Sequence, residues 1–215
     1  MDVAHPIRIV TPTLDGPVLE VLARTTRPLT GSEIHRIAGV GSPNGIRLAL
    51  ARLADQGVVI AEERARAVFY VANRDHLGWP AIESLANVRH ALFERLGGEI
   101  QSWDPQPLHA SLFGSAALFG SAARGDGDTR SDIDLLVIRP DGLDEDESPW
   151  AEQVDRLRER IYRWTGNHGQ VFQLDRSRLA EYVRAGDPLV GAWLRDAVEL
   201  AGPPLSVHIR TLPPA

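Results

Sequence analysis

Two aspartates at the head of an aliphatic run place the strongest constraint on this chain, because Asp132-Ile133-Asp134 leads directly into Leu-Leu-Val-Ile. Side chains at positions i and i+2 of a strand point to the same face, so we expect Asp132 and Asp134 to project together. Two neighbouring carboxylates repel each other unless a cation lies between them. Oxygen ligands with open positions suit Mg²⁺, which retains water and completes its coordination with substrate phosphates. The start of this strand is therefore a predicted Mg²⁺ site.

A glycine-serine turn precedes the two aspartates. Gly120-Ser121 begins twelve residues before Asp132, and Arg124-Gly125 follows it. Glycine permits a close approach of the backbone, and amides at a helix start together with a serine hydroxyl can hold a phosphate. A metal site combined with a phosphate cradle specifies phosphoryl or nucleotidyl transfer. We therefore expect an NTP as substrate and Mg²⁺ as cofactor.

The segment LFGSAARGDGDTRSDIDLLVI, residues 118–138, resembles the signature of the polymerase-beta-type nucleotidyltransferase superfamily, and specifically of its minimal members. The resemblance implies a domain with a small mixed sheet and flanking helices, in which Asp132 and Asp134 bind the metal and act in catalysis. The nucleotide-binding residues that it implies are Gly120, Ser121 and Arg124. Minimal members often belong to toxin–antitoxin pairs and nucleotidylate their partner, while others modify tRNA or antibiotics.

The strand expected at residues 170–174 departs from this family. Members usually carry a third carboxylate there, which binds a metal or draws the proton from the attacking hydroxyl. Here the strand has Gln170 and Gln173, neither of which can act as a base. Asp175 lies just past the strand and is our candidate for the third catalytic carboxylate. His168, in the preceding turn, is an alternative base.

The six residues LFGSAA occur twice in succession, at 112–117 and 118–123. Measured from Gly114, the carboxylates lie six residues further away than the family pattern allows, so the spacing favours the second copy as the working turn. In a strand, six extra residues keep the alternation of faces, so a longer strand or a loop ahead of it could absorb them. The alternative places Leu112-Phe113 in the strand and Gly114-Ser115 in the turn.

Residues 14–77 predict three short helices followed by a β-hairpin. Thr30-Gly-Ser-Glu33 is a capping box, and Ser42-Pro43 supplies an N-cap and a first-turn proline for the third helix. Two β-prone runs flank the charged tip at residues 64–66. This order resembles the winged helix-turn-helix domain of bacterial transcription regulators, whose third helix enters the major groove while the wing contacts the backbone. The DNA-binding residues that the resemblance implies are Asn44, Arg47, Arg52, Arg64 and Arg66.

These patterns predict an α+β protein with four parts. They are a winged helix-turn-helix domain at residues 1–78, a connecting helix and linker at 79–104, a nucleotidyltransferase domain at 105–202 and a flexible tail at 203–215. The apolar stripe of the connecting helix could pair with its copy in a homodimer or pack on its own domain.

Composition limits the remaining classes. The 215 residues include no cysteine, which excludes disulfides and thiolate metal sites. No apolar run approaches the ~20 residues of a membrane span, and the start MDVAHPIRIV lacks the features of a secretory signal, so we expect a cytoplasmic protein without membrane contact. A net charge of −6 argues against nucleic-acid binding over the whole surface but permits one basic face.

Two functions remain open at this point. The first is an enzyme that transfers a nucleoside monophosphate to a protein such as a toxin, to a tRNA end or to a small molecule. The second is a DNA-binding transcription regulator whose nucleotidyltransferase-like domain binds a nucleotide without catalysis. The missing third carboxylate favours the regulator, whereas the Gly-Ser and Asp-x-Asp elements favour binding of an NTP and a metal.

Overall fold

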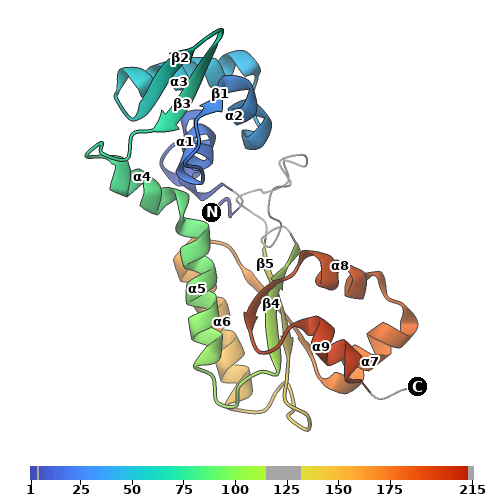
Figure 1. The fold of residues 1–215 in the computed structure, drawn as a ribbon. Helices are drawn as coiled ribbons and strands as arrows, with labels where there is room; N and C mark the ends of the chain where they lie inside the picture. Colours follow the sequence, from blue (N-terminus) through green and yellow to red (C-terminus); the bar gives the residue numbers. More distant parts are fainter. Residues whose placement is uncertain (4, 115–131, 213–215) are drawn as a thin grey trace. The chain divides into compact units, whose positions relative to one another are not determined.

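The computed structural model describes residues 1–3, 5–114 and 132–212, and these fall into two compact units (Figure 1). The N-terminal unit comprises residues 2–89, and the C-terminal unit comprises the described residues from 90 onward. No helix within the described ranges is both long enough and apolar enough to cross a lipid bilayer.

The N-terminal unit contains helices packed beside a small antiparallel sheet of order β1-β3-β2. Its elements are η1 Pro6–Ile9, α1 Asp15–Ala23, β1 Leu29–Thr30, α2 Gly31–Ala38, α3 Pro43–Asp55, β2 Val59–Arg64, β3 Ala67–Ala72 and α4 Trp79–Ala86. Leu22, Ile34 and Leu50 are fully buried, one from each of the three helices α1 to α3. The expected order of three helices and a hairpin is therefore present.

Local capping chemistry explains where α2 and α3 begin. The Thr30 hydroxyl accepts a hydrogen bond from the Glu33 amide at 3.3 Å, and the Glu33 carboxylate accepts one from the Thr30 amide at 2.8 Å. The hydrogen bonds from Thr30, followed by the one from Arg27, lower the pKa of Glu33 to about 2. Ser42 caps α3 by accepting from the Gly45 amide at 3.1 Å. These contacts satisfy amides that a helix start leaves without partners.

The predicted connecting helix is divided in two. Helix α4 ends at Ala86, and α5 spans Val88–Gln101, with Asn87 between them in a non-helical conformation. Trp79 is 2% exposed and packs in the core of the N-terminal unit, whereas most of α5 belongs to the C-terminal unit. The prediction of a single helix was wrong. The apolar spacing continues from one helix to the next, but α4 packs against the core of the N-terminal unit and most of α5 belongs to the C-terminal unit.

The C-terminal unit is built on a four-stranded mixed sheet of order β6-β5-β4-β7. Strand β5 pairs in parallel with β6, while β4 pairs antiparallel with both β5 and β7. The strands are β4 His109–Phe113, β5 Ile133–Ile138, β6 Gly169–Leu174 and β7 Val198–Ala201. The helices besides α5 are α6 Trp150–Thr165, α7 Arg176–Ala185, α8 Pro188–Asp196 and α9 Leu205–Arg210.

Helices cover both faces of this sheet. In Figure 1, α5 and α6 lie on one side of it, and α7, α8 and α9 lie on the other. Leu136 and Ile138 of β5 pack in one apolar cluster with Leu179, Trp193 and Leu205, which come from α7, α8 and α9. Strand β5 is thus buried on both faces, which agrees with its continuous aliphatic sequence.

The last two residues of strand β4, Leu112 and Phe113, are the first two residues of the first LFGSAA copy. Leu112 is aligned with Leu135, and Phe113 with Asp134, in the β4–β5 pair. Our spacing argument favoured the second copy at the junction of strand and turn, but the strand ends within the first copy. The strand includes Leu112 and Phe113 because these two residues pair with Leu135 and Asp134 of β5. The second copy lies outside the described residues.

The predicted tail contains α9, the fifth helix among the described residues of this unit, which our tail assignment missed. Within residues 203–212, Leu205–Arg210 form α9, and Leu205 is 1% exposed. His109 of β4 is fully buried nearby, with Nδ1 2.9 Å from the Pro203 carbonyl and Nε2 3.0 Å from the Ser111 hydroxyl. Burial lowers the pKa of His109 to about 4, so at neutral pH the uncharged ring donates to Pro203 and accepts from Ser111. These contacts hold the segment before α9 against the sheet.

Candidate active site

The carboxylates of Asp132 and Asp134 lie at the edge of the sheet where β5 and β6 both begin. Because the two strands are parallel, residue 170 of β6 is aligned with Asp134. The Gln170 side-chain amide donates a hydrogen bond to Asp132 Oδ2 at 3.2 Å. Phe113 at the end of β4 is aligned with Asp134 on the other side. The starts of two strands and the end of a third therefore meet at this carboxylate edge.

The two carboxylates influence each other electrostatically. Burial raises the pKa of Asp134, and the negative charge of Asp132 raises it further. None of the ion pairs among the described residues involves either carboxylate. Within the part of the chain that the structure describes, no positive side chain pairs with this negative charge, which suits a cation site.

The donor set at this edge fits Mg²⁺ as far as it is described. Within residues 1–3, 5–114 and 132–212, no group of three or more His, Cys, Asp or Glu side chains could hold a metal ion. Two carboxylates are nevertheless sufficient for Mg²⁺ when water and substrate phosphates supply the other oxygen ligands. Asp132 and Asp134 would hold such an ion.

Gly114 lies directly against Asp134. Its φ is +69°, and a Cβ placed on it would lie 2.9 Å from Asp134 Oδ2. A side chain at this position would therefore be strained and would push the carboxylate aside. The glycine of the first copy thus contacts the carboxylate edge. The predicted nucleotide-binding residues Gly120, Ser121 and Arg124 lie outside the described residues, so their roles stay predictions.

The structure does not place Asp175 with the other two catalytic candidates. It lies after the last residue of β6 and caps α7, where its Oδ1 accepts from the Arg178 amide at 2.8 Å. Asp132 and Asp134 lie at the opposite end of the parallel pair. A third carboxylate at this position cannot join the pair, because the length of β6 separates them. Gln170 is the side chain of β6 that reaches Asp132.

His168 lies close to the carboxylate edge through its backbone. Its carbonyl accepts a hydrogen bond from the Ile133 amide at 2.8 Å, between the two aspartates. Its exposed ring stacks on Tyr162 with centroids 5.3 Å apart and an interplanar angle of 30°. The alternative base considered from the sequence is therefore near the strand start.

The five predicted DNA-binding residues all belong to the N-terminal unit, but they differ in their contacts. Asn44 and Arg47 are exposed on α3, and Arg47 Nη2 donates to Asn44 Oδ1 at 2.9 Å. Arg52 forms an ion pair with Asp15 of α1. Arg64 pairs with Glu62 and stacks over Phe69, whereas Arg66 is exposed at the tip of the hairpin. Arg52 and Arg64 thus hold the fold together as well as adding charge.

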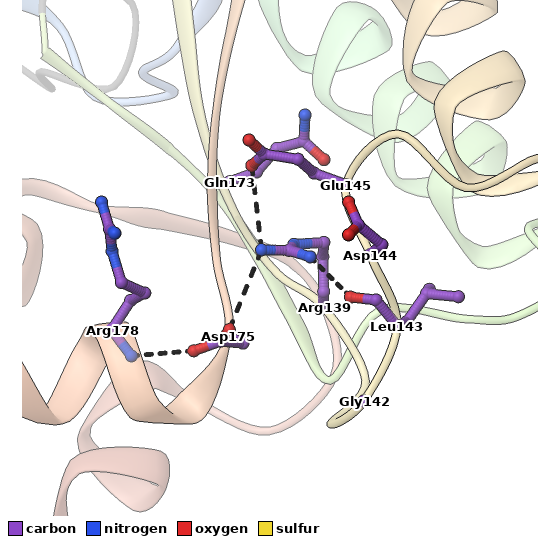
Figure 2. A pocket seen from close by; sticks show the side chains of 8 residues that line it. All are labelled: Arg139, Gly142, Leu143, Asp144, Glu145, Gln173, Asp175 and Arg178. Carbon is purple, nitrogen blue, oxygen red and sulfur yellow. Dashed lines mark hydrogen bonds and ion pairs between the residues drawn. The ribbon is translucent and has the colours of Figure 1, made fainter.

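Sequence reasoning missed a pocket at the other end of β5 and β6. It lies beside Arg139, which follows β5, and extends to the C-terminal end of β6 and to the loop after residue 141 (Figure 2). No short motif marks it, because its residues come from three separate segments. The consecutive charges Asp144 and Glu145 were the only signal of it in the sequence.

Comparison with protein families gives one match. Residues 111–181, about a third of the chain, match the Nucleotidyltransferase domain family. The matched part contains β5, α6, β6 and both aspartates of the carboxylate edge. It supports a general nucleotidyl-transfer function for the C-terminal unit. No curated protein and no solved structure matched the chain.

Proposed function

We propose that the C-terminal unit is a Mg²⁺-dependent nucleotidyltransferase that transfers a nucleoside monophosphate from an NTP to a hydroxyl group. The observation that carries this proposal is the carboxylate pair Asp132 and Asp134, which has no ion-pair partner among the described residues and lies within the segment matching the Nucleotidyltransferase domain. A paired carboxylate site at a strand start suits a metal that also contacts substrate phosphates.

The proposed reaction is a displacement at the α-phosphorus of the NTP. The acceptor oxygen forms a bond to that phosphorus, the bond to the bridging oxygen breaks, and pyrophosphate leaves with the electron pair. When bound, Mg²⁺ would offset the negative charge on the phosphates. Asp132 and Asp134 would hold the ion, and the Gln170 amide donates a hydrogen bond that orients Asp132. The acceptor proton passes to a base at this edge, for which His168 is the candidate.

The acceptor is a hydroxyl group of a protein, an RNA or a small molecule. A toxin protein or the end of a tRNA would match the toxin–antitoxin systems suggested by the sequence resemblance. Both are proposals about partners, and a cell lysate tests them together because it presents all three acceptor classes at once.

We also propose that the N-terminal unit is a winged helix-turn-helix domain that binds DNA. The exposed residues that we propose contact DNA are Asn44 and Arg47 on α3 and Arg66 at the hairpin tip. Arg47→Ala should weaken binding to an operator selected from random DNA by roughly 1–3 kcal/mol if Arg47 contacts a base. Arg95→Ala, at an exposed position of α5 in the C-terminal unit, is the control that should change binding little. Equal losses in both variants would favour a general charge effect over base recognition.

Gln170 favours a second candidate function. It contacts Asp132 from the strand on which family members usually carry a third carboxylate. An amide can hold a carboxylate in place but cannot accept the acceptor proton. The alternative is therefore a transcription regulator that binds a nucleotide and a metal without transferring the nucleotide.

One experiment separates the two candidates. The purified chain is incubated with each of four α-labelled NTPs, Mg²⁺ and a cell lysate, beside the Asp132→Asn/Asp134→Asn variant. Label on a protein or RNA only with the unmutated chain would support the enzyme and identify the acceptor class. Equal labelling by both proteins would contradict the assignment of the site.

A Gln170→Glu variant sharpens the same experiment. If the unmutated chain binds Mg²⁺–NTP without transfer, and Gln170→Glu begins to release pyrophosphate, the amide is what makes the natural chain a nucleotide-binding regulator. Failure of both proteins to bind any Mg²⁺–NTP would contradict both candidates.

A further inference from the structure

The pocket beside Arg139 has a volume of about 420 Å³ and lies at the end of the sheet opposite the carboxylate edge (Figure 2). Asp134 is aligned with residue 170, whereas Ile138, directly before Arg139, is aligned with Leu174 at the far end of β6. These two positions are about 13 Å apart along the strand. A ligand in this pocket would therefore be separate from the nucleotide.

Arg139 lines this pocket, and its guanidinium group does not make all of its possible hydrogen bonds within the described residues. Its side chain is 9% exposed, so it is nine-tenths buried. Nη1 donates to the Leu143 carbonyl at 2.5 Å, whereas Nε has no hydrogen-bond partner among the described residues. A buried donor without a partner is unfavourable, and a ligand that carries acceptor atoms removes that cost.

Two carboxylates face the same guanidinium at distances too long for a hydrogen bond. Nη2 lies 3.8 Å from Glu145 Oε2 and 3.9 Å from Asp175 Oδ2. Each gap can be bridged by one group that accepts a hydrogen bond from the nitrogen and donates one to the carboxylate. A hydroxyl group does both, whereas a phosphate oxygen can only accept and an ammonium group can only donate.

The neighbouring side chains are already held in place. Gln173 Oε1 accepts from Trp150 Nε1 at 2.6 Å, so its amide nitrogen is left for other contacts. Asp175 is fixed by its cap on α7 through Oδ1, which leaves Oδ2 toward Arg139. Figure 2 shows Glu145, Gln173 and Asp175 gathered around the Arg139 guanidinium. Preorganised donors and acceptors of this kind cost little to order on binding.

The charges of the lining exclude other ligand classes. The lining contains two arginines, Arg139 and Arg178, and three carboxylates, so it carries a formal charge of −1. A di- or triphosphate would be repelled by the carboxylates, and a small cation would meet the guanidinium of Arg139. A neutral molecule with several hydroxyl groups fits both the charge and the volume.

We propose that this pocket binds a polyhydroxylated ligand of the size of a mono- or disaccharide. Its hydroxyl groups bridge Arg139 to Glu145 and to Asp175, and Gln173 adds a donor. The proposal goes beyond nucleotidyl transfer and does not depend on it, because none of the four residues contacts the carboxylate edge.

The test uses saturation-transfer NMR and calorimetry on the full chain. The probes are D-ribose, D-glucose, D-glucosamine and sucrose, with inorganic phosphate and CaCl₂ as the competing ligand classes. We expect at least one sugar to bind with a Kd in the millimolar range. Glu145→Gln and Asp175→Asn should each weaken it about fivefold or more. Asparagine preserves the cap of α7, so the second variant should fold normally.

Two controls make the result specific. Glu147→Gln changes an exposed carboxylate near the pocket that does not line it, and sugar binding should be unchanged. The Asp132→Asn/Asp134→Asn variant should lose Mg²⁺–NTP binding and keep sugar binding, which separates this proposal from the proposed enzyme. Absence of binding by all four sugars would overturn the proposal. Sugar binding by both pocket variants that equals that of the unmutated chain, or phosphate or Ca²⁺ binding that Glu145→Gln abolishes, would also overturn it.

Discussion

The two ends of strand β5 present opposite electrostatic situations. At its start, Asp132 and Asp134 repel each other, and no described positive group pairs with them. Just past its end, the Arg139 guanidinium is buried between carboxylates that lie too far away for hydrogen bonds. The first arrangement requires added positive charge, whereas the second requires uncharged groups that both accept and donate. The interactions that a folded chain leaves incomplete thus indicate the chemical class of each ligand.

The largest expected effect comes from replacing the two carboxylates at the start of β5, which leaves the Arg139 pocket unchanged. Asp132→Asn/Asp134→Asn should weaken Mg²⁺-dependent NTP binding by about 100-fold or more, because the variant lacks both carboxylates that would bind the metal. Equilibrium binding with a fluorescent NTP, with and without Mg²⁺, measures the loss. Unchanged binding would mean that the carboxylate edge is not the nucleotide site.

The next effect tests which copy of the repeat serves the carboxylate edge. Gly114→Ala places a methyl group 2.9 Å from Asp134 Oδ2 at a residue with φ of +69°. It should lower the free energy of unfolding by about 2–3 kcal/mol and weaken Mg²⁺-dependent NTP binding. Gly120→Ala is the matched variant in the second copy, and urea unfolding compares the two. A larger loss from Gly120→Ala would support the prediction that the second copy is the working turn.

A third change disturbs the Arg139 end alone. Trp150→Phe removes the donor to Gln173 and part of a fully buried side chain, so the free energy of unfolding should fall by about 1.5–2 kcal/mol. Sugar binding should weaken while Mg²⁺–NTP binding stays the same. Trp164→Phe, on the same helix but partly exposed, should cost less than about 0.5 kcal/mol. A loss of nucleotide binding in Trp150→Phe would show that the two ends are coupled.

The smallest effect has the opposite sign. Asp134→Asn should stabilise the metal-free chain by up to about 1 kcal/mol at pH 7, because it removes repulsion from a half-buried carboxylate that solvent partly screens. The pKa of Asp134 is raised above its ordinary 3.8, so its contribution to stability is present below that pH and is lost as the pH rises through the folded-state pKa.

Thermal unfolding in EDTA across pH 4 to 8 measures this difference. The gap between Asp134→Asn and the unmutated chain should widen as the pH increases and close when Mg²⁺ is added, because the ion stabilises only the carboxylate form. A variant less stable than the parent in EDTA would contradict the repulsion.

Features fixed by neighbouring residues were predictable from the sequence. At each of the caps Thr30 and Ser42, the side-chain hydroxyl accepts a hydrogen bond from the backbone amide three residues later, and both caps form as expected. The strand that begins at Ile133 follows in the same way from its short, continuous aliphatic run. Short-range chemistry decides these elements, so a single sequence contains the information.

Features fixed by distant pairing were not predictable. Identical copies of LFGSAA have identical local preferences, and only alignment of Phe113 with Asp134 distinguishes them. Asp175 seemed close enough to serve as a catalytic carboxylate, but the parallel pairing of β5 and β6 places it at the opposite end. The burial of Leu205 likewise depends on contact with other helices, which the polar, proline-containing sequence around it does not reveal.

The position of β4 within the repeat has a consequence for how this gene can vary. Loss or gain of one in-frame copy of LFGSAA would still leave Leu-Phe-Gly after Ser111, so the residues aligned with β5 would be unchanged. Only the length of the connection from Gly114 to Asp132 would differ. Replication slippage could therefore generate alleles of different length that keep the same sheet, and natural selection could act on the connection separately from the core.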